Sequence, residues 1–489
     1  MLRDARTADE EGPEAFAVAL ARRLDEVGEI DPVALADLFS CGFDRSPYGA
    51  AVAAEVRAFL VRRTLAHARA HAPYYRDRAV YAGETAWDAL PTIDRAAVSA
   101  AGADFLADDV HLRSVCHTSG TTGQPLEVYK SHEEIRFIGA CFSRLIAPLL
   151  AGERSLSLSF PSVHHGVPIP MPSPNIVFVG GMSDDTLIRD AHRVLATPYV
   201  VDGKERRISA LSGFGYQLIF FTNYLLEQKV DPAGFGLAAI SVAGGFLPDY
   251  WREFLEKSWG CPVHDRYSLT EGVGGATRCH GCGLFRPDLQ VLFEAVDIDT
   301  GAPVAAGIGK LLVTNLYPFA QMMPLIRYET GDLVRVGACA CGGGAPMAAF
   351  EFLGRYRNCI SAGTGAGRRW LLFSAKLNNL LTAVPDLNLY EWFSNVRVAK
   401  DRTVGSLPIM ALTHEVGADG RITIRIEVEL RYSPYTRADR VAALTRTLTE
   451  DLSACAGTAL GEALADGSAE LDIEFLPPGG FEGEYMIKI

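Results

Sequence analysis

A loop rich in hydroxyl groups and glycine lies near residue 120. It reads His117-Thr118-Ser119-Gly120-Thr121-Thr122-Gly123-Gln124-Pro125 and follows an apolar stretch. Glycine lets backbone N–H groups approach a polyphosphate closely, and hydroxyls donate further hydrogen bonds to its oxygens. The G-x-x-x-x-G-K-[ST] pattern is absent, which excludes a Walker-type loop. A polar surface turn is the alternative, but a string of this length favours phosphate binding.

Two close cysteine pairs form a second group that could do chemistry. They are Cys279-His280-Gly281-Cys282 and Cys339-Ala340-Cys341. Together they offer four thiolates, which Zn²⁺ binds in a tetrahedron, and His280 could replace one of them. Four protein ligands leave no open position, so the predicted zinc is structural. The alternative is a buried or disulfide-bonded set, which a reducing compartment disfavours.

The elements that must position these residues change along the chain. The first hundred residues read as helices, with apolar residues at helical spacing over 48–70. From about residue 112 to 336, short β-rich runs alternate with helix-like stretches, which indicates parallel sheets covered on both faces. After a glycine-rich break at 361–367, alternating residues over 421–430 predict a strand. The predicted fold class is α/β, with a large N-terminal domain of parallel or mixed sheets covered by helices and a small C-terminal α+β domain.

Three more strings occur in order after the hydroxyl-rich loop: Tyr267-Ser268-Leu269-Thr270-Glu271, Arg327-Tyr328-Glu329-Thr330-Gly331-Asp332 and Gly354-Arg355. All four resemble motifs of the adenylate-forming superfamily, although Ser268 replaces a glycine. The strings Pro73-Tyr74-Tyr75-Arg76 and Leu90-Pro91-Thr92-Ile93-Asp94-Arg95 resemble the phenylacetate–CoA ligase branch. Within it, length and character are similar to ATP-dependent amide bond synthetases of the McbA type. The resemblance implies an adenylation domain over 1–354 and a hinge with a mobile lid over 355–489.

The resemblance also implies a reaction, in which a carboxylate attacks the α-phosphorus of ATP and pyrophosphate leaves. Such a site needs cations and oriented donors, because two anions must meet. The implied β- and γ-phosphate ligands are Thr118, Ser119, Gly120, Thr121, Thr122 and Gly123. Thr270 would bind the α-phosphate and Glu271 would hold Mg²⁺, which favours carboxylate oxygen. Asp332 and Arg355 would contact the ribose, with a turn aspartate and a surface arginine as the alternatives.

The same resemblance places the adenine near Tyr267 and Ser268, beside Gly244 and Gly245. Phe246 stands where the family has an acidic residue, and could instead line an aryl pocket. The acid pocket is expected at Phe214 and Gly215, with core packing as the alternative. His164 and His165 follow a predicted strand and are candidates to face the acid, with exposed loop histidines as the alternative.

Two further residues are candidates for catalysis. Asp202 could orient or deprotonate an amine, although it also fits an Asp-Gly turn. In the family a lysine near the C-terminus reaches the carboxylate and the α-phosphate. Here Glu484 occupies the directly matching position, and Lys488 is the only Lys or Arg after Arg446. Lys488 is therefore the predicted catalytic cation, with a solvated chain terminus as the alternative.

The composition limits the classes of molecule that the protein is expected to bind. The 489 residues include 46 Lys and Arg against 59 Asp and Glu, a net charge of −13, which opposes binding to nucleic acid or an anionic membrane. No apolar run is long enough to span a membrane, and the acidic N-terminus does not resemble a signal peptide. Ten unevenly spaced cysteines fit a reducing compartment, so a cytoplasmic location is expected. The oligomeric state stays open, a homodimer included.

Three functions compete at this point. The first is ATP-dependent activation of an aryl or heteroaryl acid as acyl-AMP, followed by capture with an amine to give an amide. The second is the same activation followed by capture with coenzyme A. The third is a nucleotide-binding protein without catalysis. The acidic composition and the scarcity of cations near the C-terminus argue against a coenzyme A phosphate site, so the sequence favours the amide synthetase.

Overall fold

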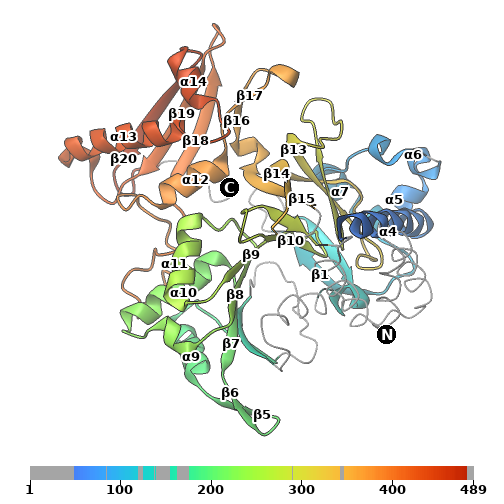
Figure 1. The fold of residues 1–489 in the computed structure, drawn as a ribbon, viewed down its shortest axis with the longest axis horizontal. Coiled ribbons are helices and arrows are strands. Elements are labelled where there is room, and N and C mark those ends of the chain that lie inside the picture. The colour runs from blue at the N-terminus through green and yellow to red at the C-terminus, as the bar shows by residue number, and fades with distance from the viewer. Residues whose placement is uncertain are drawn as a thin grey trace.

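The protein is described from a computed structural model, which covers residues 49–83, 85–118, 125–136, 138, 155–161, 176–288, 290–341 and 346–481. Its centre is an eleven-stranded mixed sheet (Figure 1) with the order β12-β13-β14-β15-β11-β10-β9-β8-β7-β3-β4. Five strands at one end are parallel: β3 (Leu156–Phe160), β4 (Ile176–Val179), β7 (Ile208–Gly213), β8 (Ala239–Ala243) and β9 (Val263–Ser268). The rest are antiparallel: β10 (Gly275–Arg278), β11 (Phe285–Pro287), β12 (Val291–Val296), β13 (Gly307–Asn315), β14 (Tyr328–Cys339) and β15 (Met347–Arg355). The predicted α/β class with mixed sheets is confirmed.

The parallel half is covered by helices. Three of them lie on one side of strands β7 and β8 in Figure 1: α9 (Asp185–Ala196), α10 (Gly215–Glu227) and α11 (Asp249–Trp259). Every residue of β3 is buried, as expected for a strand with both faces covered. The apolar side chains of these strands and helices form one core, which includes Phe220 and Trp259.

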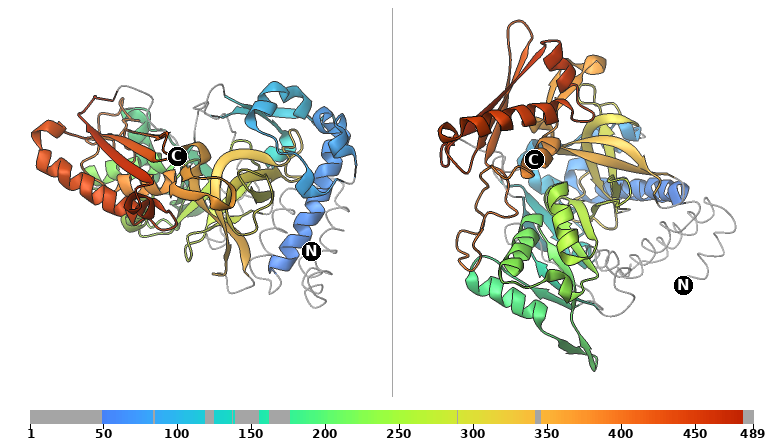
Figure 2. Two further views of the ribbon diagram at one scale, coloured as in Figure 1. Left: turned by 90° about the horizontal axis from the view of Figure 1, so that it is seen from above. Right: turned by 60° about the vertical axis from the view of Figure 1, so that its left-hand side comes forward.

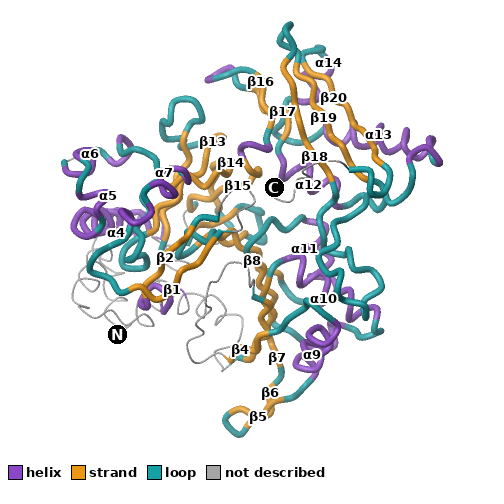
Figure 3. Tube along the Cα trace, turned by 180° about the vertical axis from the view of Figure 1, so that it is seen from behind, coloured by secondary structure: helices purple, strands orange, loops and turns teal. Residues whose placement is uncertain are grey.

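The N-terminal helices pack on the antiparallel half. They are α4 (Gly49–His71), α5 (Pro73–Arg76), α6 (Ala79–Ala82) and α7 (Arg95–Ala100), with the short 3₁₀ turns η1 (Trp87–Ala89) and η2 (Gly102–Phe105). Seen from behind, they flank β13–β15, and the hairpin of β1 (Leu112–His117) and β2 (Glu127–Ser131) lies below them (Figure 3). The buried Arg327 guanidinium donates to the backbone oxygens of Trp87, Asp88 and Leu90, and it lies 3.6 Å from a Glu294 oxygen. This arginine therefore holds the chain that leads into α7.

The C-terminal part is a smaller α+β unit. It contains β16 (Ile360–Ala362), β17 (Arg369–Leu372), α12 (Ser374–Thr382), β18 (Met410–Val416), β19 (Ile422–Glu429), α13 (Ala438–Ser453), α14 (Leu460–Ala465) and β20 (Ala469–Leu476). Strand β19 alternates buried and half-buried or exposed residues through its first six positions, as the sequence pattern predicts. It pairs antiparallel with β18 and parallel with β20.

One connection of this unit reaches back to the parallel half. Residues 391–405 lie between α12 and β18 and are called the strap below. They run beside helices α9 and α10 of the parallel half (Figure 2). Phe393 stacks on Phe220 of α10 with ring centroids 4.0 Å apart. The Asp185 carboxylate accepts hydrogen bonds from the backbone N–H groups of Arg397 and Val398. The strap therefore belongs to the core around α9 and α10 by its contacts. Among the described residues, no helix combines the length and apolarity needed to cross a membrane.

Candidate nucleotide and acid site

A buried carboxylate links two strands of the antiparallel half to β9, the last strand of the parallel half. Asp332 on β14 is directly opposite Arg355 on β15, and an Arg355 Nη1–Asp332 Oδ1 distance of 3.0 Å joins them. The Tyr267 hydroxyl, from the end of β9, donates to the other Asp332 oxygen. Only 2% of Asp332 is exposed. The structure thus brings together three residues that the resemblance placed around the ribose and the adenine.

Burial and charge together set the ionisation of this group. Burial raises the pKa of Asp332, while the Arg355 guanidinium and the Tyr267 hydroxyl act in the opposite direction. Burial, reinforced by the charge of Asp332, raises the pKa of Tyr267 well above its usual range. Tyr267 therefore stays protonated and remains a donor. The Arg355 pKa is raised, chiefly by the charge of Asp332, so Arg355 remains a cation.

The turn after β9 carries the predicted metal ligand. Glu271 is 9% exposed, and the Tyr328 hydroxyl donates to its Oε1 at 3.0 Å. The Asn315 amide donates to the Glu271 backbone oxygen, and the buried Lys130 ammonium donates to the next one, at Gly272. Thr270 is half-buried in the same turn. The turn is therefore fixed from three sides.

The base of the hydroxyl-rich loop closes through Thr118. Its N–H donates to the Leu126 backbone oxygen, and its Oγ1 accepts from Leu126 N–H at 2.9 Å and from the Arg95 guanidinium at 3.0 Å. Arg95 is also close enough to Tyr328 to lower the pKa of that phenol, against the larger effect of burial. A cation therefore stands between the base of the loop and the Glu271 turn. Sequence reasoning missed this role, because the string ending in Arg95 was taken only as a mark of resemblance.

Aromatic rings and glycines meet at the ends of β7 and β8. Gly244 has a φ of +88°, and a Cβ there would lie 2.4 Å from the Phe214 ring, so only glycine fits. A Cβ on Gly215 would lie 3.1 Å from Leu247. Phe246 packs near Phe352, with centroids 5.8 Å apart. Phe352 is also 5.9 Å from the Tyr267 ring. Phe214 thus packs against Gly244, and Phe246 follows the glycine pair, both members of which are exposed.

Asp202 is the predicted residue that the structure separates from this group. It lies in the turn between β5 (Tyr199–Val201) and β6 (Lys204–Arg206), with φ of 52° at Asp202 and 73° at Gly203. Two successive positive φ values are typical of a tight hairpin turn, for which Asp-Gly is a preferred sequence. Figure 1 shows this hairpin projecting at the far end of the molecule from β14 and β15. The expected role of Asp202 toward an amine is therefore not retained.

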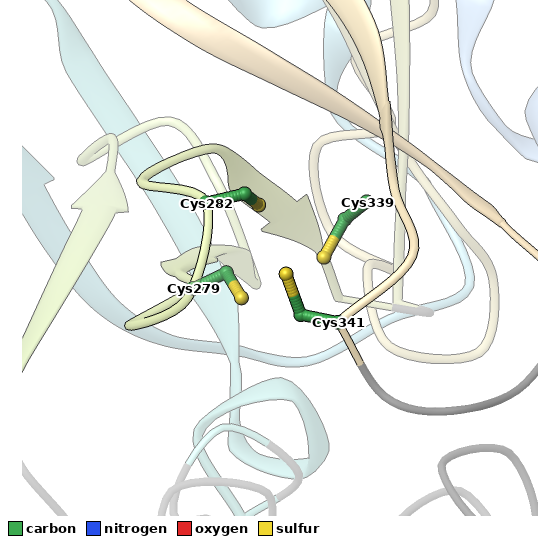
Figure 4. Close-up of side chains that lie close together, drawn as sticks. All are labelled: Cys279, Cys282, Cys339 and Cys341. Atoms are coloured by element: carbon green, nitrogen blue, oxygen red, sulfur yellow. The ribbon is translucent and has the colours of Figure 1, made fainter.

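Several predicted residues lie outside the described part of the chain. These are Ser119, Gly120, Thr121, Thr122, Gly123, His164, His165 and Lys488. Ser268 is described and is exposed at the end of β9. The sulfurs of Cys279, Cys282, Cys339 and Cys341 all lie within 4.8 Å of one another (Figure 4). His280 does not join them, since its Nδ1 lies 3.8 Å from a Glu256 oxygen.

Comparison with known proteins gives the class of the fold. No family model matches the chain. Two crystal structures of a 2-hydroxyisobutyryl-CoA ligase are similar. An open form bound to 2-HIB-AMP and CoA has a TM-score of 0.58 at 16% identity, covering 88% of this chain and 90% of that one. A postadenylation form has a TM-score of 0.56 at 15% identity, covering 89% and 90%. The chain thus has the fold of the adenylate-forming ligase superfamily.

Sequence similarity adds two curated relatives. A phenylacetate–coenzyme A ligase of Thermus thermophilus is 28% identical over 244 residues, which are 46% of this chain and 51% of that one. Protein CapK of Staphylococcus aureus is 26% identical over 155 residues, 30% of this chain and 32% of that one. The matched part spans about half the length of the ligase and about a third of CapK. A specific likeness to amide bond synthetases is not among these findings.

Proposed function

We propose that the protein is an AMP-forming ligase that activates a carboxylic acid with ATP. The observation that carries this proposal is the convergence of Tyr267 and Arg355 on the buried Asp332 carboxylate. The Glu271 turn and Arg95 at the base of the hydroxyl-rich loop add the groups that a triphosphate needs. The fold of the 2-hydroxyisobutyryl-CoA ligase and the sequence of the phenylacetate–coenzyme A ligase support it.

In the first step, a carboxylate oxygen of the acid attacks the α-phosphorus of ATP. The bond from the α-phosphorus to the bridging oxygen breaks, and pyrophosphate leaves with the electron pair. Asp332 would accept hydrogen bonds from the ribose hydroxyls, and Arg95 would lie at the β- and γ-phosphates. The step needs no general base, because the attacking carboxylate is already an anion. What the site must supply is positive charge and fixed donors.

Mg²⁺ fits the donor set of the Glu271 turn. Glu271 offers a carboxylate oxygen and Thr270 offers a hydroxyl, and hard oxygen ligands are those that Mg²⁺ prefers. When bound, the ion would neutralise phosphate charge. Tyr328 would orient the Glu271 carboxylate through its hydrogen bond to Oε1. Lys130 would hold the turn through the Gly272 oxygen.

The C-terminal residues 355–489 would act as the lid and bring Lys488 to the carboxylate and the α-phosphate. An ammonium suits this position because it is a compact charge that can approach both anions. Closure of a lid would also keep water from the acyl adenylate. The acid pocket would be formed around Phe214, Gly244 and Phe246, which suits an apolar or aryl acid.

The acceptor in the second step is coenzyme A or an amine. In either case the nucleophile attacks the acyl carbonyl, AMP leaves, and the nucleophile loses a proton. The relatives favour coenzyme A, because the two ligases described above carry it in their names. The amine remains the second candidate because arginines of the C-terminal unit pair with carboxylates, as Arg425 does with Asp472 and Arg440 with Asp386. Such pairing leaves less positive charge for a 3′-phosphate.

The test is to incubate the protein with Mg-ATP and a panel of aryl and aliphatic acids, and to measure pyrophosphate release. Coenzyme A and amines are then added separately, and product masses distinguish thioester from amide. Glu271→Gln is the matched control, since it keeps the shape but removes the charge, and it should abolish pyrophosphate release. Absence of acid-dependent pyrophosphate release with every acid would refute the proposal.

A further inference from the structure

We propose that Cys279, Cys282, Cys339 and Cys341 bind one Zn²⁺ ion, and that this ion fastens a weak junction in the central sheet. The four sulfurs lie within 4.8 Å of one another and point into the same space between two loops (Figure 4). In a tetrahedral site with Zn–S bonds of about 2.3 Å, sulfurs are roughly 3.8 Å apart. Shifts of about an ångström or less would therefore close the site.

The first pair is held as a ligand knuckle by its own backbone. Cys279 N–H donates to the Leu284 oxygen at 2.8 Å, and Gly283 N–H donates to the Cys279 oxygen at 2.9 Å. The N–H groups of Gly281 and Cys282 point at the Cys279 sulfur. Donors of this kind orient a metal-bound thiolate and partly offset its charge.

The two loops also fit closely against each other. A Cβ on Gly281 would lie 2.9 Å from the Cys341 sulfur and 3.2 Å from its Cβ, so glycine is needed for the approach. The N–H of Cys341 donates in turn to the Cys339 sulfur, as the knuckle donors do to Cys279. Both loops thus present backbone donors to the first cysteine of each pair.

Apolar burial and disulfides account poorly for this cluster. Cys282 and Cys341 are exposed, so removal of apolar surface from water does not gather them. All four cysteines are free thiols. Four unbonded thiols that converge from two loops are what a tetrathiolate metal site requires.

The position of the cluster in the sheet indicates a structural role for the ion. The first pair follows β10, the second pair begins at the last residue of β14, and β11 and β15 lie between these strands. Strands β11 and β15 are joined through a single residue pair, Phe285 with Phe350, while β14 and β15 pair along eight positions. The junction between β11 and β15 is therefore the weak one. A metal bound by both loops would bridge it.

This junction separates the parts of the nucleotide site. Tyr267 lies on β9, which pairs with β10, whereas Asp332 and Arg355 lie on β14 and β15. The Tyr267–Asp332 hydrogen bond thus crosses the sheet region that the ion would fasten. This consequence rests on the proposed function, but the binding of zinc does not.

The test begins with the metal content of the purified full-length chain, measured by inductively coupled plasma mass spectrometry. We expect about one zinc per chain in the wild type. In the doubly substituted protein Cys282→Ser/Cys341→Ser the zinc should be lost, because both ligands are removed. Cys455→Ser, a half-buried cysteine on α13's C-terminal side, is the control and should keep its zinc. Wild-type protein without zinc, stoichiometric iron in its place, or full zinc in the double variant would overturn the proposal.

The fastening role has a separate readout that needs no ATP. Hydrogen exchange of the wild-type protein is compared before and after chelation, which avoids dependence on a variant that folds poorly. Exchange should rise in β10, β11 and the end of β14, and stay unchanged in β19 and β20. If removal of zinc changes the exchange of β10, β11 and the end of β14 no more than that of β19 and β20, the fastening role is refuted. Failure of the adenylation assay with zinc still bound would instead refute the proposed function alone.

Discussion

Asp332→Asn tests the nucleotide site most directly. The Asp332 carboxylate is 2% exposed and accepts hydrogen bonds from Tyr267 and Arg355. Asparagine keeps the shape but removes the charge and turns one acceptor oxygen into an NH₂ donor. That donor must face either Arg355, which can only donate, or Tyr267, whose hydroxyl would have to give up its own donation to Asp332 and accept instead. The substitution therefore removes the ribose acceptor and weakens the clamp that positions it.

The expected size follows from the bonds that are lost. Hydrogen bonds to a charged group contribute about 1.5–3 kcal/mol each, and a ribose presents two hydroxyls. Because the asparagine oxygen keeps part of one bond, we expect a loss of about 3 kcal/mol. This corresponds to a decrease of roughly 10²-fold in kcat/KM for ATP.

The assay is acid-dependent pyrophosphate release with ATP and with 2′,3′-dideoxy-ATP. The wild type should prefer ATP by a factor similar to the loss in the variant, because both changes delete the same bonds. Asp332→Asn should then show only a small preference, from the part of one bond that the asparagine oxygen keeps. Tyr267→Phe, which keeps the carboxylate charge, should lose about 1 kcal/mol and retain the preference. A full preference for ATP in Asp332→Asn would mean that Asp332 does not bind the ribose.

Three other predictions concern separate parts of the molecule. Arg95→Ala should raise KM for ATP about tenfold or more, because a charged donor to the phosphates is lost, and an unchanged KM in the same assay would place Arg95 away from them. Burial raises the pKa of Asp265 to about 7, so the folded state binds its proton more tightly than the unfolded state and stability falls as pH rises from about 4 to 7. In urea unfolding, this group should lower the free energy of unfolding by about 3 kcal/mol between pH 5 and 8, and the decrease should be absent in Asp265→Asn. An equal dependence of the free energy of unfolding on pH in the variant would contradict this. Phe393→Ala should destabilise the fold by about 3 kcal/mol in thermal unfolding, since Phe393 stacks on the buried Phe220, and an unchanged midpoint would show that the strap is not part of that core.

Local strings and patterns carried much of the prediction. The alternation of strands and helices was enough for the α/β class, because each element shows its own periodicity. The approach of Asp332 to Arg355 depends on the β14–β15 hairpin, whose strands are close in sequence. Short sequence separation explains why such contacts can be anticipated from motifs.

Long-range contacts and turn geometry explain why other parts of the site could not be predicted from the sequence. Arg95 reaches Thr118 because Arg327, more than 200 residues away, holds the chain before α7 by its backbone oxygens. No local pattern reveals such an anchor. Asp202 failed for the opposite reason, since its Asp-Gly dipeptide is itself a strong turn signal and sufficient to explain the residue.

The strap limits how a C-terminal lid could move. The predicted boundary at 354–355 rests on Gly354-Arg355, where a Cβ on Gly354 would overlap Ser374 at the start of α12. Rotation of all of 355–489 as one body would pull Phe393 and Val396 from the core that contains Phe220. At about 1.5–3 kcal/mol for each buried side chain, that is a large fraction of the stability of a domain.

A lid that rotates without this loss must leave the strap in place. The chain would then have to bend at the predicted hinge and again at both ends of the strap. Gly405 ends the strap with a φ of +84°, and a Cβ there would lie 2.9 Å from Ile219 of α10. The glycine thus allows this end of the strap to lie directly against α10, and its backbone allows the chain to change direction at the next residues. Motion of the C-terminal unit is therefore expected to concentrate in the segments on either side of 391–405, with the strap itself remaining on α9 and α10.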